Sequence, residues 1–146
     1  MGSEELIGHL FRFFPQEEFL GNPAPHDCVE CSEIRNALAG VTWPDITPQF
    51  LEEHDGDLPL LTREAYVLFL PAWLREAVLR PSGPVAGMLM VNLGDKASPA
   101  GFSSSQGWAI LQVAHYIARN NTYGAQDPVN LAAVAEIESV WGKHAA

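Results

Sequence analysis

Residues 62–78 read TREAYVLFLPAWLREAV, and this stretch decides the fold. Thr62 is a typical N-cap residue, and Glu64 follows in the first turn, where a carboxylate suits the helix dipole. Apolar residues then recur with the period of a helix. They are Ala65, Tyr66, Phe69, Trp73, Leu74, Ala77 and Val78. Because Pro71 lies inside this stripe, we expect a kink or a break into two helices near Leu70.

Capping signals predict further helices on both sides of this stretch. Ser103 and Gln106 form a capping box, and Asp127-Pro128 opens a last helix. Towards the N-terminus, Ser3 and the pair Thr47-Pro48 are expected to begin two more helices. In each case the cap stands directly before a run of apolar residues, as at the start of an amphipathic helix.

Residues 85–93 (VAGMLMVNL) are ambiguous, because they are apolar and have no clear period. Such a run fits a buried helix or a short extended segment, and its helical neighbours favour the helix. Trp43 is expected to anchor the core after a turn at Gly40. We therefore predict a mainly α fold, with residues 1–146 forming one domain, an irregular helical bundle of about six helices.

The chain is acidic, with a formal net charge of −10 from 18 acidic and 8 basic residues among 146. This balance argues against nucleic acid or anionic lipid as a partner, since phosphates are bound by Lys and Arg. It would attract a basic protein, although solubility alone also explains it. No window approaches the roughly 20 apolar residues of a membrane span. The acidic N-terminus is unlike a secretory signal, so we expect a cytoplasmic bacterial protein.

The stretch His26-Asp27-Cys28-Val29-Glu30-Cys31 holds both cysteines of the chain. We predict that a helix begins here, with Asp27 as N-cap and Glu30 completing a capping box. On that helix the two thiols share a face. One imidazole and two thiolates within six residues suit a tetrahedral ion such as zinc. The fourth ligand would be His54 first, and otherwise His115, His9 or a carboxylate.

Two other interpretations of the cysteines stay open. Cys-x-x-Cys at a helix N-terminus can act as a redox dithiol, because the helix dipole lowers the pKa of a thiol. The acidic neighbours Asp27, Glu30 and Glu33 oppose that shift by repelling a thiolate. Alternatively, both cysteines are inert apolar residues of the core. Elsewhere, Ser103, Ser104 and Ser105 lack the surroundings of a catalytic nucleophile and are better explained by capping.

Several runs together resemble an uncharacterised bacterial family, a domain of unknown function. They are the Cys28/Cys31 segment and residues 38–43 (LAGVTW), 60–66 (LLTREAY), 70–74 (LPAWL) and 102–106 (FSSSQ). The most specific part is the helix signature with Glu-Ala-Tyr followed by Leu-Pro-Ala-x-Leu. The resemblance spans roughly residues 6–117 and implies one domain. It brings no activity and no catalytic residues.

Charge and the lack of a convergent catalytic set favour a non-enzymatic interaction protein. The concrete form is an immunity- or antitoxin-like protein that neutralises a basic partner. The alternative is a zinc-binding or thiol-dependent protein that uses His26, Cys28 and Cys31. These two hypotheses differ in whether a metal or a thiol is needed.

Overall fold

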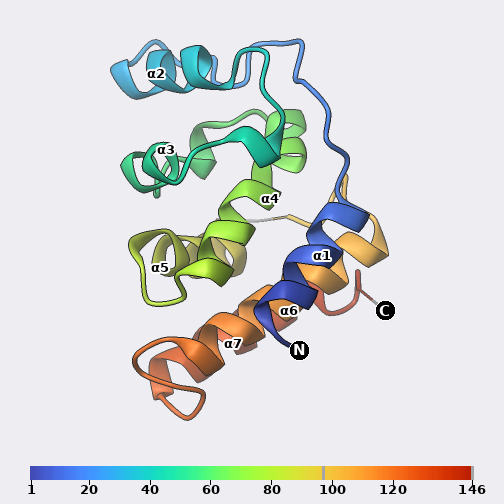
Figure 1. Ribbon diagram of the computed structural model, residues 1–146. Helices are drawn as coiled ribbons and strands as arrows, with labels where there is room; N and C mark the ends of the chain where they lie inside the picture. Colours follow the sequence, from blue (N-terminus) through green and yellow to red (C-terminus); the bar gives the residue numbers. More distant parts are fainter. Residues whose placement is uncertain (97, 146) are drawn as a thin grey trace.

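The computed structural model describes residues 1–96 and 98–145, and the regular secondary structure of this part of the chain is all helical, with seven α-helices and no strand (Figure 1). The predicted mainly α bundle is therefore confirmed. The α-helices are α1 (Ser3–Phe13), α2 (Val29–Leu38), α3 (Pro48–Glu53), α4 (Arg63–Leu79), α5 (Pro84–Val91), α6 (Ser104–Asn120) and α7 (Pro128–Trp141). Short 3-10 turns, η1 (Trp43–Asp45) and η2 (Leu58–Leu60), and a π-turn, η3 (Asn92–Lys96), lie between them.

Helix α4 is the centre of the bundle and packs against α1, α3, α5 and α6. Figure 1 shows α2 and α3 at one end of the molecule and α6 and α7 towards the other, with α4 between them. Most of its residues are buried, including the large side chains Phe69, Leu70 and Trp73. The apolar stripe was thus a correct guide to the core.

Of the two outcomes expected at Pro71, the break is wrong, because α4 runs unbroken from Arg63 to Leu79, and the kink stays a prediction. Proline removes one backbone hydrogen bond inside a helix and crowds the preceding turn. Here Pro71 is buried, and the residues on both sides of it are in the core. Packing on both halves of the helix offsets the local cost, which sequence periodicity does not measure.

Four of the six N-caps predicted from the sequence are confirmed, and those at Ser3 and Asp27 are wrong. The side chains of Thr62 and Thr47 accept hydrogen bonds from backbone N–H groups of α4 and α3. Ser103 and Gln106 form the predicted reciprocal capping box at α6. Asp127 caps α7 through the N–H groups of Val129 and Asn130. At α1 the N-cap is Gly2, and Ser3 is the first helical residue.

Residues 85–93 are helical and not extended, which resolves the ambiguity in favour of α5 and the start of η3. The run has no period because α5 is apolar on two sides. Val85, Ala86 and Leu89 are buried, whereas Met88 and Val91 are exposed. Two hydrogen bonds hold the chain after α5 to α4 and α7. Tyr66 Oη on α4 donates to Asn92 Oδ1 at 2.7 Å, and Trp141 Nε1 on α7 donates to the Leu93 carbonyl at 3.1 Å.

Helix α2 starts one residue later than predicted. Its N-cap is Cys28, whose sulfur accepts the N–H of Cys31 at 3.3 Å, so the predicted Asp27–Glu30 capping box is wrong. Arg35 Nη1 donates to the carbonyls of Ala24 (2.6 Å) and His26 (3.0 Å) and ties α2 to the loop before it. None of the described helices is long and apolar enough to cross a membrane.

Candidate functional site

The four predicted metal ligands lie at the end of the molecule formed by α2 and α3 (Figure 1). His26 and Cys28 are exposed, while Cys31 is fully buried. Among the described residues, no three His, Cys, Asp or Glu side chains are grouped so that they could hold a metal ion. Zinc binding at His26, Cys28, Cys31 and His54 therefore stays an untested alternative hypothesis, and these four side chains are not grouped for it in this fold.

His54 is the buried member of this set, with an exposed fraction of 3%. Its Nδ1 lies 2.7 Å from Asp57 Oδ2, and its Nε2 lies 3.3 Å from Glu33 Oε2. The ring also lies against Phe50, with centroids 4.5 Å apart. Both ring nitrogens therefore face carboxylates. Because Glu33 lies on α2 and His54 directly follows α3, the contact between them joins α2 to the end of α3.

The cysteines divide into one exposed and one buried thiol. Burial raises the pKa of the Cys31 thiol, and the neighbouring Cys28 thiol raises it further. A raised pKa leaves less thiolate at neutral pH, which is the reverse of what a redox nucleophile needs. For Cys31 the structure favours the core interpretation; exposed Cys28 serves as the cap of α2.

The histidines named as further ligand candidates lie on other helices and have other partners. His115 on α6 is 3.1 Å from Glu138 on α7. His9 on α1 stacks on Phe13, with centroids 5.4 Å apart, and meets the edge of Trp108 at 5.1 Å. Both histidines therefore help to hold helices together.

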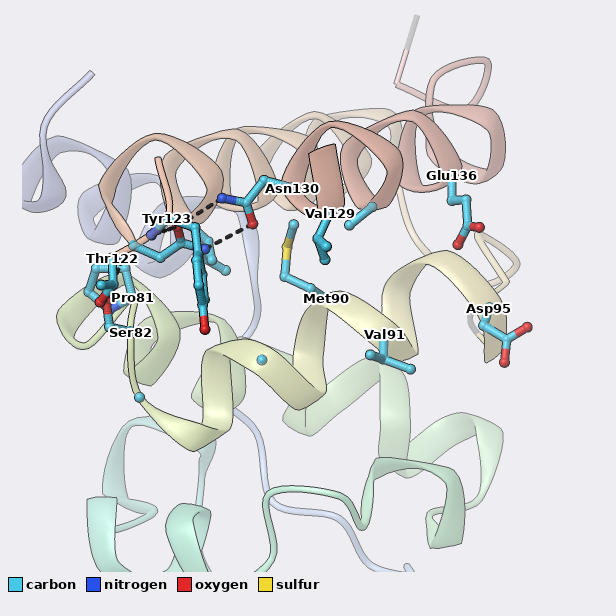
Figure 2. A pocket seen from close by; sticks show the side chains of 15 residues that line it. Pro81, Ser82, Met90, Val91, Asp95, Thr122, Tyr123, Val129, Asn130 and Glu136 are labelled. Carbon is cyan, nitrogen blue, oxygen red and sulfur yellow. Dashed lines mark hydrogen bonds between the residues drawn. The ribbon is translucent and has the colours of Figure 1, made fainter. Parts of the chain in front are cut away.

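A cavity of the size of a ligand-binding cleft lies elsewhere, between α5, the turn after α6, and α7 (Figure 2). We call it the α5–α7 groove, and its volume is about 670 Å³. Its lining comes from four segments: residues 81–83 (Pro81, Ser82, Gly83), α5 with η3 (Gly87, Met90, Val91, Asp95), the end of α6 with the following turn (Ile117, Asn121, Thr122, Tyr123) and α7 (Val129, Asn130, Ala133, Glu136). This size falls within the range of ligand-binding clefts.

The middle of the α5–α7 groove is apolar. Buried Met90 and Ile117 and half-buried Ala133 line it from three helices. Val91 on α5 and Val129 on α7 also line the groove and are 60% and 76% exposed, and Figure 2 shows Met90 and Val129 pointing towards each other between the helices. Exposed apolar side chains around a hollow are typical of an interaction site.

One end of the α5–α7 groove is closed by a network of amides and hydroxyls. Asn130 is buried and donates to the Gly124 carbonyl and to Asn121 Oδ1, both at 2.8 Å, while Asn121 Nδ2 donates back to Asn130 Oδ1 at 3.0 Å. Ser82 Oγ accepts the Thr122 N–H at 2.9 Å and ties the start of α5 to this turn. These bonds fix the shape of the closed end.

The opposite end of the groove carries the carboxylates of Asp95 and Glu136 (Figure 2). No Lys or Arg is among the described residues that line it. The groove therefore has a direction, from a closed amide end through an apolar middle to an acidic end.

Sequence reasoning did not find this groove. Its residues come from positions 81–136, and residues 120–124 (NNTYG) have only the composition of a turn. The one usable signal was that residues 85–93 are almost all apolar. This composition fits a helix with one side in the core and another side along a cavity. Nothing local to the sequence shows that α7 would lie opposite α5.

Arginines and acidic residues are placed differently in this fold. Four arginines are held by the protein itself: Arg35 and Arg75 donate to backbone carbonyls of Ala24, His26 and Pro44, and Arg63 to those of Ser98 and Ala100. Arg80 pairs with buried Glu76. Most acids, in contrast, are exposed. The exposed set is Glu4, Glu5, Glu17, Glu18, Asp27, Glu30, Glu33, Asp45, Glu52, Glu53, Glu64, Asp95, Glu136 and Glu138.

No protein-family model, no curated protein and no solved structure matches this chain.

Proposed function

We propose that this is a non-enzymatic interaction protein of the cytoplasm that binds a basic protein partner, in the manner of an immunity protein or antitoxin. The observation that carries the proposal is the distribution of charge: most acidic residues are exposed, whereas four of the six arginines contact backbone carbonyls or Glu76. A basic partner would meet a surface on which exposed carboxylates outnumber exposed cations, which speeds encounter and disfavours nucleic acid.

Two of the arginines, Arg63 and Arg75, are engaged in contacts within the fold. Arg75 lies over the Trp43 ring at 5.4 Å while it donates to the Pro44 carbonyl at 3.0 Å. Arg63 lies at 5.4 Å from the Tyr66 and Phe102 rings. Such arginines act as structural donors with stacked planar heads, a use that suits guanidinium better than ammonium. A binding surface for an anion would need these groups to be available.

The test is capture of a partner by the tagged protein from a native extract at low and at high salt. We expect a basic protein that is retained at about 50 mM salt and released at about 500 mM, because screening weakens interactions between exposed charges. An unrelated acidic protein of equal net charge is the control for simple ion exchange. A partner whose binding ignores salt, or the absence of any basic protein beyond the control, would overturn the proposal.

A further inference from the structure

We propose that the α5–α7 groove binds a small molecule that is uncharged, with a flat apolar body of about two or three rings and one hydrogen-bonding group at its end. The rings would lie between α5 and α7 beside Met90, and the hydrogen-bonding group would meet the hydroxyls of Ser82 and Thr122 at the closed end. This inference does not rest on the proposed basic partner and adds a second kind of ligand.

The shape of the groove favours a small molecule over a segment of a protein. Its volume of about 670 Å³ falls within the roughly 300–1,000 Å³ of clefts that bury small ligands. The hydrogen bonds between Asn121 and Asn130 close one end, so a bound molecule must end there. A helix or strand that binds through spaced anchors continues past them. The groove therefore suits a compact molecule.

Gly87 is part of the groove wall, and the packing of the fold does not require a glycine there. It lies inside α5 and is exposed, and a Cβ added to it would meet nothing within 4 Å. Glycine inside a helix destabilises that helix relative to alanine or leucine. The missing side chain leaves bare backbone in the wall, and a flat ring can approach such a surface closely.

The middle of the groove sets the apolar character of the ligand. Met90 and Val129 point towards each other between the helices, and Val91 and Val129 are largely exposed (Figure 2). A ligand between the helices would remove this surface from water. The thioether of Met90 makes favourable contacts with aromatic rings, and the exposed Tyr123 ring also lines the groove. These groups favour a ring system.

The closed end provides the hydrogen bonds. The N–H and Oγ1 of Thr122 lie 2.9 Å and 3.0 Å from Ser82 Oγ. Whichever hydroxyl donates within this pair, the other keeps its hydrogen, and acceptor lone pairs remain as well. Because the pair is already held in place, a ligand N–H, hydroxyl or carbonyl can replace water there at little ordering cost.

The charge of the protein disfavours an anionic ligand. The net charge is −10, Glu136 lines the end opposite Ser82, and no Lys or Arg is among the described residues that line the groove (Figure 2). A sulfonate or carboxylate would be repelled. The apolar middle also gives a charged group of either sign no partner for the water it loses. We therefore expect an uncharged ligand.

The experiment titrates the whole protein with two fluorescent probes that share one ring system. The first, 1-anilinonaphthalene, is uncharged and has a single N–H. The second, 8-anilino-1-naphthalenesulfonate, adds a sulfonate to the same skeleton. Both fluoresce more strongly in apolar surroundings than in water. We expect one equivalent of 1-anilinonaphthalene to bind with a dissociation constant of about 10 µM or less, and the sulfonate to bind at least about tenfold more weakly.

Matched variants then locate the probe. Gly87→Leu fills the bare wall, whereas Gly8→Leu makes the same change inside α1, at an exposed position that does not line the groove and where a Cβ also meets nothing within 4 Å. Both should raise the melting temperature, because leucine is the better helix former. We expect only Gly87→Leu to weaken 1-anilinonaphthalene binding, by about tenfold or more. Ser82→Ala should weaken it several-fold, and Ser32→Ala, at an exposed position on α2, should not.

Three outcomes would overturn the inference: no binding of 1-anilinonaphthalene, equal or tighter binding of the sulfonate, or equal binding to Gly87→Leu and Gly8→Leu. If Gly87→Leu lowers the melting temperature, Gly87→Ala with Gly8→Ala as its control takes its place, with an expected loss of about threefold. Self-association that Gly87→Leu abolishes would also overturn it, by assigning the groove to a second copy. Capture of a basic partner is judged separately and is unaffected by these results.

Discussion

His54 is the residue that connects the cysteine-bearing helix to the rest of the fold. It is buried between Asp57 and Glu33 and against the Phe50 ring. We predict that His54→Ala lowers the free energy of unfolding by about 2–4 kcal/mol, because it removes two polar contacts and leaves a cavity. Urea denaturation measures this. His115→Ala, at a half-exposed position, is the control and should cost less, and equal costs would contradict the role given to His54.

The Glu30 carboxyl makes the stability of this region depend on pH. Its pKa is raised above 4.5, first through a hydrogen bond to Asp57 and then by the negative charge of Asp57. The folded protein therefore binds more protons than the unfolded chain just above pH 4.5, and stability is lost as pH rises through the folded pKa.

We accordingly predict that Glu30→Gln raises the melting temperature at pH 7, where it removes the repulsion from Asp57. The gain should disappear near pH 4, where the native carboxyl is protonated. Thermal denaturation at the two pH values, with Glu52→Gln as the control for loss of one exposed carboxylate, measures the difference. A gain of the same size at both pH values would contradict the pairing of Glu30 with Asp57.

The same end of the molecule also contains the residues predicted to bind zinc. With Cys31 buried and both nitrogens of His54 facing carboxylates, we predict that protein purified without chelator contains less than about a tenth of an equivalent of zinc. We also expect that EDTA leaves the melting temperature unchanged. Elemental analysis decides: stoichiometric zinc that is lost in Cys28→Ser would restore the metal-binding alternative.

At the residue scale, the sequence predicted most, though not all, of the caps that depend on near neighbours, since Ser3 and Asp27 are not caps. Thr62, Ser103 and Asp127 cap helices because the bond partner lies two or three residues away. The contact between His54 and Glu33 could not be predicted in the same way. It depends on how α2 lies over α3, and only long-range packing fixes that arrangement.

At the scale of elements, the turn between α6 and α7 is the clearest case of structure held by buried polar groups. Asn130 satisfies the Ala118 and Gly124 carbonyls and bonds Asn121, so the start of α7 is fixed to the end of α6. The turn cluster was visible in the sequence. Its second role, closing one end of the α5–α7 groove, was not visible, because α5 is brought there by packing on α4.

We predict that Asn130→Ala destabilises the fold by about 2–4 kcal/mol, since buried carbonyls would lose their donor. Asn120→Ala, on the exposed end of α6, removes only a bond to the Tyr116 carbonyl and should cost about 1 kcal/mol or less. Chemical denaturation compares the two. If both cost the same, the amide network does not hold the turn.

Helices α4 and α5 show where periodicity stops being informative. Proline inside an apolar stripe predicted a kink or a break, and burial along the whole of α4 keeps the helix from breaking. In α5 the period was lost because one side serves the core and another lines the groove. In both helices, tertiary packing overrides local preference.

At the scale of the whole molecule, the excess of acidic residues bears on the proposed function. A net charge of −10 destabilises a compact chain by self-repulsion, although it also keeps a protein soluble. Exposed acidic residues outnumber exposed basic residues, so the repulsion acts at the surface. This arrangement suits a protein that meets a basic partner, because binding neutralises the same charges that strain the free protein.

Self-repulsion among the acidic residues predicts that salt stabilises the free protein. Raising NaCl from about 20 mM to about 200 mM shortens the screening length from roughly 20 Å to less than 10 Å. We expect the melting temperature to rise by about 2–4 °C, which corresponds to about 1 kcal/mol in a chain of this size. A Glu52→Lys/Glu53→Lys variant, which changes two exposed acids on α3, should gain less. A melting temperature that falls with salt would mean that favourable ion pairs outweigh repulsion, and the argument from self-repulsion to a basic partner would fail.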